Sequence, residues 1–193
     1  MLPMNSTNSF DTFCRDLSRQ VIDMGALKAA VVPVSDVRFE AVFRDMCKSN
    51  ACGKYGRCWT CPPDIGTIDQ LMEDAKSYSH ILVYQTVGIL EDSFDFEGMM
   101  EAGNKHNQLA QDVLKWSKTL PLARSLALGA GGCRVCSVCA RETNEPCRHP
   151  ELAMSSLEAY GIAVSELAKT CGMKYINGPD TVTYFGCLFF DPE

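Results

Sequence analysis

The sequence lacks any run of about 18 consecutive apolar residues, the length that a membrane-spanning helix needs. Its first residues, MLPMNSTNSFDTFCRD, have no basic segment followed by an apolar core, which is the pattern of a secretory signal. Positive charge is also scarce, since 18 Lys and Arg stand against 24 Asp and Glu and the net charge is -6. We therefore expect a cytoplasmic protein whose partners include neither a membrane nor a nucleic acid, because phosphate binding draws on clustered Lys and Arg.

Familiar catalytic and nucleotide-binding motifs are absent as well. The sequence contains no Gly-x-Gly-x-x-Gly, Walker lysine, His-Glu-x-x-His or nucleophile elbow. It has no internal repeat, low-complexity segment or linker, and 193 residues with 46% hydrophobic content suit one domain covering residues 1–193. Whether the protein is an enzyme stays open at this point.

Cysteine, in contrast, is abundant. The chain has 11 cysteines, and this odd number would leave one thiol over from a complete set of disulfides. Within a loop at residues 129–150, three of them are spaced every third residue and a fourth follows after seven intervening residues: Cys133, Cys136, Cys139 and Cys147. Consecutive Cys-x2-Cys-x2-Cys thiolates can each reach a different iron of a cube, so this spacing favours a [4Fe-4S] cluster.

Other interpretations of this loop remain. A zinc ion needs four tetrahedral ligands and usually receives them from two separated Cys-x2-Cys pairs, which makes zinc the alternative metal. Plain thiols or disulfides are a third possibility. The role of Cys147 is also open, because it could be the fourth ligand, could leave one iron without a protein ligand, or could be replaced by His149.

A second group of cysteines lies upstream, in a loop at residues 47–63 with the sequence CKSNACGKYGRCWTCPP. Its spacing is Cys-x4-Cys-x5-Cys-x2-Cys, and its members are Cys47, Cys52, Cys58 and Cys61. The Cys61-Pro62 step is similar to the Cys-Pro that closes ferredoxin motifs. A second cluster, a zinc ion and redox-active thiols are all compatible with this group.

Several residues near these loops have ordinary structural explanations. Gly129, Gly131 and Gly132 either let backbone N–H groups approach cluster sulfides or simply form a tight exit from a strand. His106 shares a face with the apolar residues of its predicted helix, so we expect a buried, hydrogen-bonded histidine. The remaining cysteines, Cys14, Cys171 and Cys187, are expected to pack as small apolar side chains.

Hydrophobic periodicity predicts an α/β fold. Helices are expected in the first 27 residues and over residues 37–46, 67–76, 97–120 and 155–171, the last opened by a capping box of Ser155 and Glu158. Strands are expected over residues 29–34, 80–88, 122–128 and 181–190, with Pro33 favouring an edge position. The predicted architecture is a single domain with a mixed sheet flanked by helices, from which two cysteine-rich metal-binding loops emerge.

The ordered motifs CGKYGRCWTCPP, CRVCSVCARETNEPCRHPE and SSLEAYGI carry a resemblance to a known family. They are similar to those of the domain-of-unknown-function family numbered 2284, over a stretch from about Met46 to the last strand. The resemblance implies metal binding, with an iron-sulfur group favoured, and supplies no reaction. It implies that the ligands are the eight cysteines of the two loops: Cys47, Cys52, Cys58, Cys61, Cys133, Cys136, Cys139 and Cys147.

Three functions follow as hypotheses. The first is an iron-sulfur protein that passes single electrons to a redox partner protein. The second is an iron-sulfur enzyme in which one iron lacks a protein ligand and acts as a Lewis acid. The third is a zinc-binding module without redox activity. Nothing in the sequence indicates the oligomeric state.

Overall fold

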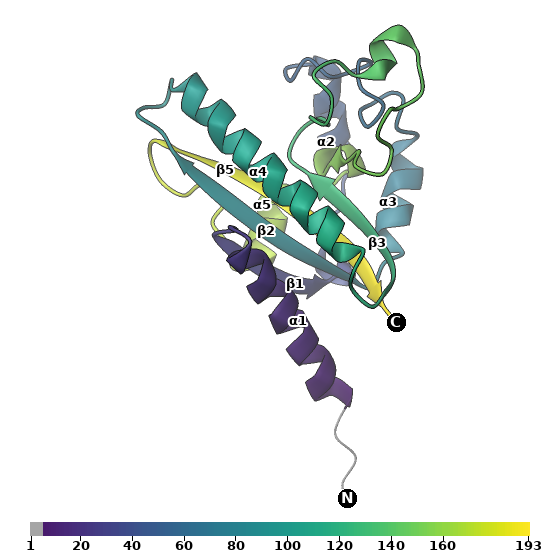
Figure 1. Cartoon of the computed structure of the whole chain (residues 1–193), viewed down its shortest axis with the longest axis vertical. Helices are drawn as coiled ribbons and strands as arrows, with labels where there is room; N and C mark the ends of the chain where they lie inside the picture. Colours follow the sequence, from purple (N-terminus) through teal and green to yellow (C-terminus); the bar gives the residue numbers. More distant parts are fainter. Residues whose placement is uncertain (1–5) are drawn as a thin grey trace, which may run out of the picture.

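The computed structural model describes residues 6–193 and has helices on both faces of one sheet (Figure 1). Its α-helices are α1 (Ser6–Asp23), α2 (Val42–Asp45), α3 (Ile68–Lys76), α4 (Phe96–Ser117) and α5 (Val164–Thr170). Its strands are β1 (Lys28–Pro33), β2 (His80–Ile89), β3 (Leu122–Gly129), β4 (Ser155–Ser156) and β5 (Thr181–Pro192). Four short 3-10 helices complete the elements: η1 (Val34–Asp36), η2 (Met46–Ser49), η3 (Ala140–Thr143) and η4 (Glu158–Tyr160).

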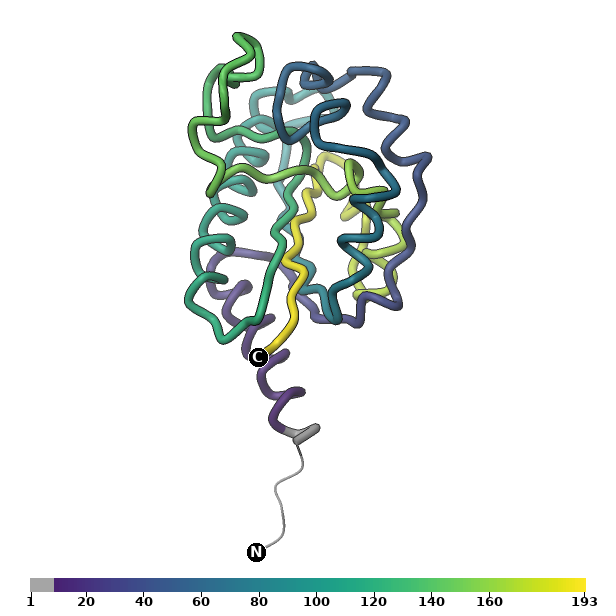
Figure 2. Tube along the Cα trace, turned by 90° about the vertical axis from the view of Figure 1, so that its right-hand side faces the viewer, coloured from purple at the N-terminus to yellow at the C-terminus, as the bar shows by residue number. Residues whose placement is uncertain are grey.

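The strands form one mixed sheet in the order β1-β2-β5-β3-β4. All neighbouring strands run antiparallel except β3 and β4, which are parallel. In Figure 2, α1 and α4 lie on one side of the sheet, and α3 and α5 lie on the other. The predicted mixed sheet flanked by helices is therefore confirmed.

Successive side chains along the central strands point to opposite faces of the sheet, and each face has its own hydrophobic core. On β2, Ile81 and Val83 point to the face covered by α3 and α5, whereas Leu82 and Tyr84 point to the face covered by α1 and α4. All four are at most 1% exposed. Because β2 and β5 are covered on both faces, they have nearly continuous apolar sequences.

The predicted secondary structure is confirmed for most elements. The predicted strands correspond to β1, β2, β3 and β5, and β1 occupies an edge of the sheet, as Pro33 indicated. The part of the predicted N-terminal helix that lies in residues 1–5 is outside the described residues. The expected histidine is also found, since His106 is 2% exposed and its Nδ1 lies 2.9 Å from the hydroxyl of Thr86.

Two helix predictions were wrong in extent. The predicted helix at residues 37–46 is reduced to α2, because Phe39 forms a β-bridge with Ile162. The helix expected from residue 155 begins only at Val164, because Ser155 and Ser156 pair with the end of β3 as strand β4. The backbone then makes the short helix η4, which ends at Gly161 with φ of 72°.

Asp95 is the N-cap of α4 and supports a prediction about acid stability. Its carboxylate accepts hydrogen bonds from the backbone N–H of Gly98, at 2.8 Å, and of Glu91, at 3.1 Å. These bonds hold the pKa of Asp95 below its ordinary value of 3.8, so folding favours the charged form. The resulting stabilisation is complete above the unfolded pKa and is lost as the pH falls through the lower folded pKa.

We therefore expect Asp95→Ala to melt at a lower temperature than the wild type at neutral pH, with a difference that shrinks in acid. Melting curves by circular dichroism at a series of pH values measure this difference. A gap between the two chains that stays constant from neutral pH to about pH 2 would contradict the assignment.

Candidate metal centre

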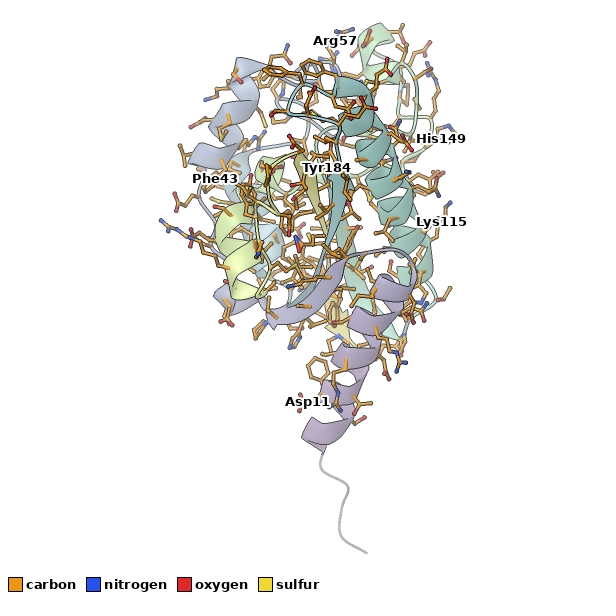
Figure 3. All side chains as sticks on the ribbon, turned by 90° about the vertical axis from the view of Figure 1, so that its left-hand side faces the viewer. Asp11, Phe43, Arg57, Lys115, His149 and Tyr184 are labelled. Atoms are coloured by element: carbon orange, nitrogen blue, oxygen red, sulfur yellow. The ribbon has the colours of Figure 1, made fainter. Side chains whose placement is uncertain are left out.

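The two cysteine-rich segments, separated in sequence by α3, β2, α4 and β3, meet at one end of the molecule. The upstream loop, residues 47–63, runs from η2 toward α3, and the downstream loop, residues 129–150, leaves the end of β3. Figures 1 and 2 both show these segments side by side beyond the end of the sheet. Figure 3 labels Arg57 of the upstream loop and His149 of the downstream loop, and both lie toward this end. The fold therefore brings the two predicted groups into one neighbourhood.

A single cavity between the loops is lined by five cysteines. Four come from the downstream loop and one from the upstream loop: Cys133, Cys136, Cys139, Cys147 and Cys58. Trp59, Arg148 and His149 complete much of the remaining wall. All five cysteines are free thiols, so none is withdrawn from the cavity by a disulfide.

The Cys58 thiol interacts with two other thiols, those of Cys133 and Cys61. Hydrogen bonds from the thiols of Cys133 and Cys61 lower the pKa of Cys58, with a smaller contribution from Thr60, whose hydroxyl oxygen is 3.4 Å from the Cys58 sulfur. The same bonds, followed by burial, raise the pKa of Cys61 and of Cys133. Cys58 is only 1% exposed and Cys61 only 8%. One of the three sulfurs is thus favoured as a thiolate, which is the form that binds metals.

Three contacts hold the upstream loop against the downstream loop. The indole N–H of Trp59 donates to the carbonyl oxygen of Glu145 at 2.8 Å. Arg141 forms an ion pair with Asp64 at 2.8 Å, and its guanidinium also lies 5.1 Å from the centre of the Trp59 ring. An ion pair at 2.9 Å joins Arg57 to Glu142. Trp59 also lines the thiol cavity, and together these contacts fix one loop relative to the other.

Gly132 has a packing role that the sequence did not reveal. A Cβ atom at this position would lie 2.8 Å from Cγ of Lys54 and 3.2 Å from the sulfur of Cys61. Glycine at this position therefore lets the upstream loop approach the downstream loop closely. This packing role is a third explanation for the glycines before Cys133, beside N–H contacts to cluster sulfides and a tight exit from the strand. Gly131, with φ of 72°, occupies the left-handed region that favours glycine.

The other upstream cysteines form a looser set. Burial raises the pKa of Cys47, followed by the effect of the Cys52 thiol, and Cys52 also contributes to raising the pKa of Cys61. Cys52 is exposed and Cys47 is partly buried. Of the upstream cysteines, Cys58 lines the downstream cavity and Cys61 lies beside it, close to Gly132 of the downstream loop, whereas Cys47 and Cys52 do not line that cavity.

The donor set suits a thiolate-bound metal group. Across residues 6–193, no three His, Cys, Asp or Glu side chains meet closely enough to hold a single metal ion. The cavity thiols are instead distributed around a shared space, and an iron-sulfur cube takes its ligands in this way, one thiolate at each iron. When bound, such a group would supply one-electron redox chemistry, while the chain provides the thiolates and limits access by water.

The ligand assignments stay predictions, and no pattern in the sequence indicates the position of Cys58 in the downstream cavity. The spacing Cys58-x2-Cys61 suggests a pair acting together, and nothing in it indicates that the first member turns toward another loop. The packing predictions hold for the other cysteines in the interior: Cys187 is fully buried in the core and Cys171 packs against it. Cys14 is partly buried on α1.

None of the helices between residues 6 and 193 is both long and apolar enough to cross a membrane. Comparison with curated proteins and with solved structures finds no significant match for the chain. Comparison with protein families finds one described as "Predicted metal-binding protein (DUF2284)", whose model matches residues 30–190. This match spans both cysteine loops and every strand of the sheet except the ends of β1 and β5. The chain therefore belongs to this family of predicted metal-binding proteins.

Proposed function

We propose that the chain is a cytoplasmic iron-sulfur protein that holds a [4Fe-4S] cluster between its two cysteine loops and passes single electrons to a partner protein. The observation that carries this proposal is the cavity lined by five cysteines. Cys133, Cys136 and Cys139 provide three thiolates, and Cys147 and Cys58 are both within reach as the fourth.

The surroundings of the cavity support an electron-transfer role. Arg148 lies in its wall, donates a hydrogen bond to the carbonyl oxygen of Val138 at 3.2 Å and pairs with Glu145 at 3.3 Å, so a positive charge that is partly offset by a carboxylate is held beside the thiolates. Cys139 is near enough to Arg141 to contribute to raising its pKa, although the hydrogen bond to Asp64 is the larger cause. Positive charge near a cluster stabilises its more negative, reduced form, and therefore raises its reduction potential.

The exposed rim of the cavity suits contact with another protein. Val138 is 54% exposed, and Arg148 and His149 beside it are exposed as well. Charges of both signs surround this apolar side chain, because Arg148 pairs with Glu145 and His149 lies 4.0 Å from Glu151. Such a rim would favour a partner surface with complementary charges of both signs. Arg148 and His149 also line the thiol cavity, so the path for an electron from this surface would be short.

Anaerobic purification followed by metal analysis tests the proposal. We expect a brown protein with about four iron and four sulfide per chain, and an EPR signal that appears after reduction with dithionite. Broad absorption in the visible range should bleach on reduction. A colourless chain with stoichiometric zinc would contradict an iron-sulfur function and would favour a zinc-binding module.

A further inference from the structure

We propose that Cys58 of the upstream loop, and not Cys147, is the fourth ligand of the group bound by Cys133, Cys136 and Cys139. This inference rests on the proposed function and adds the identity of the ligands. It makes the metal centre a link between two loops that are remote in sequence, and leaves Cys147 as a free thiol at the side of the cavity.

The first argument is the position of the Cys58 side chain. It lines the cavity together with the four downstream cysteines, although it belongs to the other loop. With 1% of its surface exposed, Cys58 is the most buried of the five cavity cysteines. A ligand in this position would close the cluster off from water on its inner side.

The second argument is that the backbone holds Cys58 in place. The N–H of Cys61 donates to the carbonyl oxygen of Cys58 at 2.9 Å, which closes a tight turn. The N–H of Gly56 donates to the carbonyl oxygen of Pro62 at 2.9 Å and joins the residues on either side of this turn. A ligand held by its own backbone needs little rearrangement to bind a metal group.

The third argument comes from the contacts between the loops. Trp59, the next residue after Cys58, is anchored to the downstream loop by its bond to Glu145. The Asp64–Arg141 ion pair anchors the same segment a few residues further along. Both contacts hold Cys58 against the cavity, as ligand binding requires.

The restraint on Cys147 comes from its own loop, where the neighbouring Arg148 bonds to Val138 and Glu145. Cys58, in contrast, is tied to the other loop through Trp59. Cys147 is partly exposed, and its neighbours Pro146 and Arg148 are both exposed. It also lies after the helix η3 and the turn at Asn144, so it is separated from the regular Cys-x2-Cys-x2-Cys curl. A free thiol at Cys147 would react with reagents from solution, whereas a Cys147 thiolate bound to the cluster would be protected. Its reactivity therefore distinguishes Cys58 from Cys147 as the fourth ligand.

Three single variants test the ligand assignment in the full chain: Cys58→Ser, Cys147→Ser and, as a control distant from the cavity, Cys14→Ser. After anaerobic purification, iron, sulfide and the EPR signal of the reduced protein are compared with the wild type. We expect Cys58→Ser to lower iron and sulfide by about tenfold or more, since even groups that only support a ligand contribute about that much to metal affinity. Cys147→Ser and Cys14→Ser should retain wild-type values.

The opposite pattern, in which Cys147→Ser loses the cluster and Cys58→Ser retains it, would overturn the assignment. The iron and sulfide content of the wild type tests the proposed function independently of the comparison between variants. A wild-type chain without iron would overturn both proposals, whereas an iron-loaded wild type with reversed variants would overturn the ligand assignment alone.

A second measurement avoids the risk that Cys58→Ser does not fold. The wild-type protein, with its cluster intact, is treated anaerobically with iodoacetamide, and the modified cysteines are located by mass spectrometry. We expect Cys147 to be alkylated before the cluster is removed, and Cys133, Cys136 and Cys139 only afterwards. Protection of Cys147 until the cluster is removed would identify it as a ligand and refute the proposal.

Discussion

Serine in place of Cys136 is expected to leave the purified chain almost free of iron. Cys136 is the middle member of the Cys-x2-Cys-x2-Cys run, so no assignment of the fourth ligand makes it dispensable. It lines the cavity from a loop that Arg148 and Trp59 help to fix, and serine offers a harder oxygen donor that iron-sulfur clusters bind less well. We expect iron and sulfide to fall by at least about tenfold, as measured after anaerobic purification.

Cys171→Ser is the matched control for this variant. Cys171 is also partly buried, but it packs at the end of α5 against the core that faces α3 and α5, and it does not line the cavity. It should retain the iron, the sulfide and the EPR signal of the wild type. Wild-type iron content in Cys136→Ser would show that the three-cysteine run is not the binding site, and the proposed function would then have to be abandoned.

Phe189→Ala is expected to cause the largest loss of stability. Phe189 is fully buried on the central strand β5, where it belongs to the core facing α3 and α5 and its ring lies 5.9 Å from that of Tyr78. Truncation removes the transfer free energy of the ring and leaves a cavity that close-packed neighbours can only partly fill. The free energy of unfolding should fall by about 3–5 kcal/mol, as measured by urea denaturation.

Ile89→Ala provides the comparison for this core variant. Ile89 is also an apolar residue on a strand of the same sheet, but it is 88% exposed at the end of β2. Its truncation should change the free energy of unfolding by no more than about 0.5 kcal/mol. Equal effects of the two variants would mean that β5 does not form the centre of the sheet.

Most of the fold could be predicted because its strands and long helices have strong local signals. The apolar stretch HILVYQTVG and the helical spacing of Leu109 and Val113 identify β2 and α4 without any tertiary information. The error at Ser155 has a tertiary cause. A serine three residues before Glu158 has the pattern of a capping box, but pairing with β3 decided the structure there.

The candidate site could be predicted only as two separate lists of cysteines. Spacing along the chain shows which thiols are neighbours within a loop, and the downstream run is indeed gathered around one cavity. The approach of Cys58 to Cys133 depends on how the two loops pack. That packing depends on Gly132 and on the contacts of Trp59 and Arg141. Short-range patterns in the sequence do not predict such long-range contacts.

The contact between Trp59 and Glu145 joins residues 86 positions apart, with α3, β2, α4 and β3 between them in the chain. A metal group with ligands from both loops could not assemble on either loop alone. The thiolates of the two loops come together only after the sheet has formed. Loading with metal would then come late, after the slow long-range pairing of β5 with β2 and β3. The bound group would stabilise the finished fold in preference to partly folded chains. Metal content would thus report on the quality of folding, and a damaged core would be detected first as a chain that fails to retain its metal.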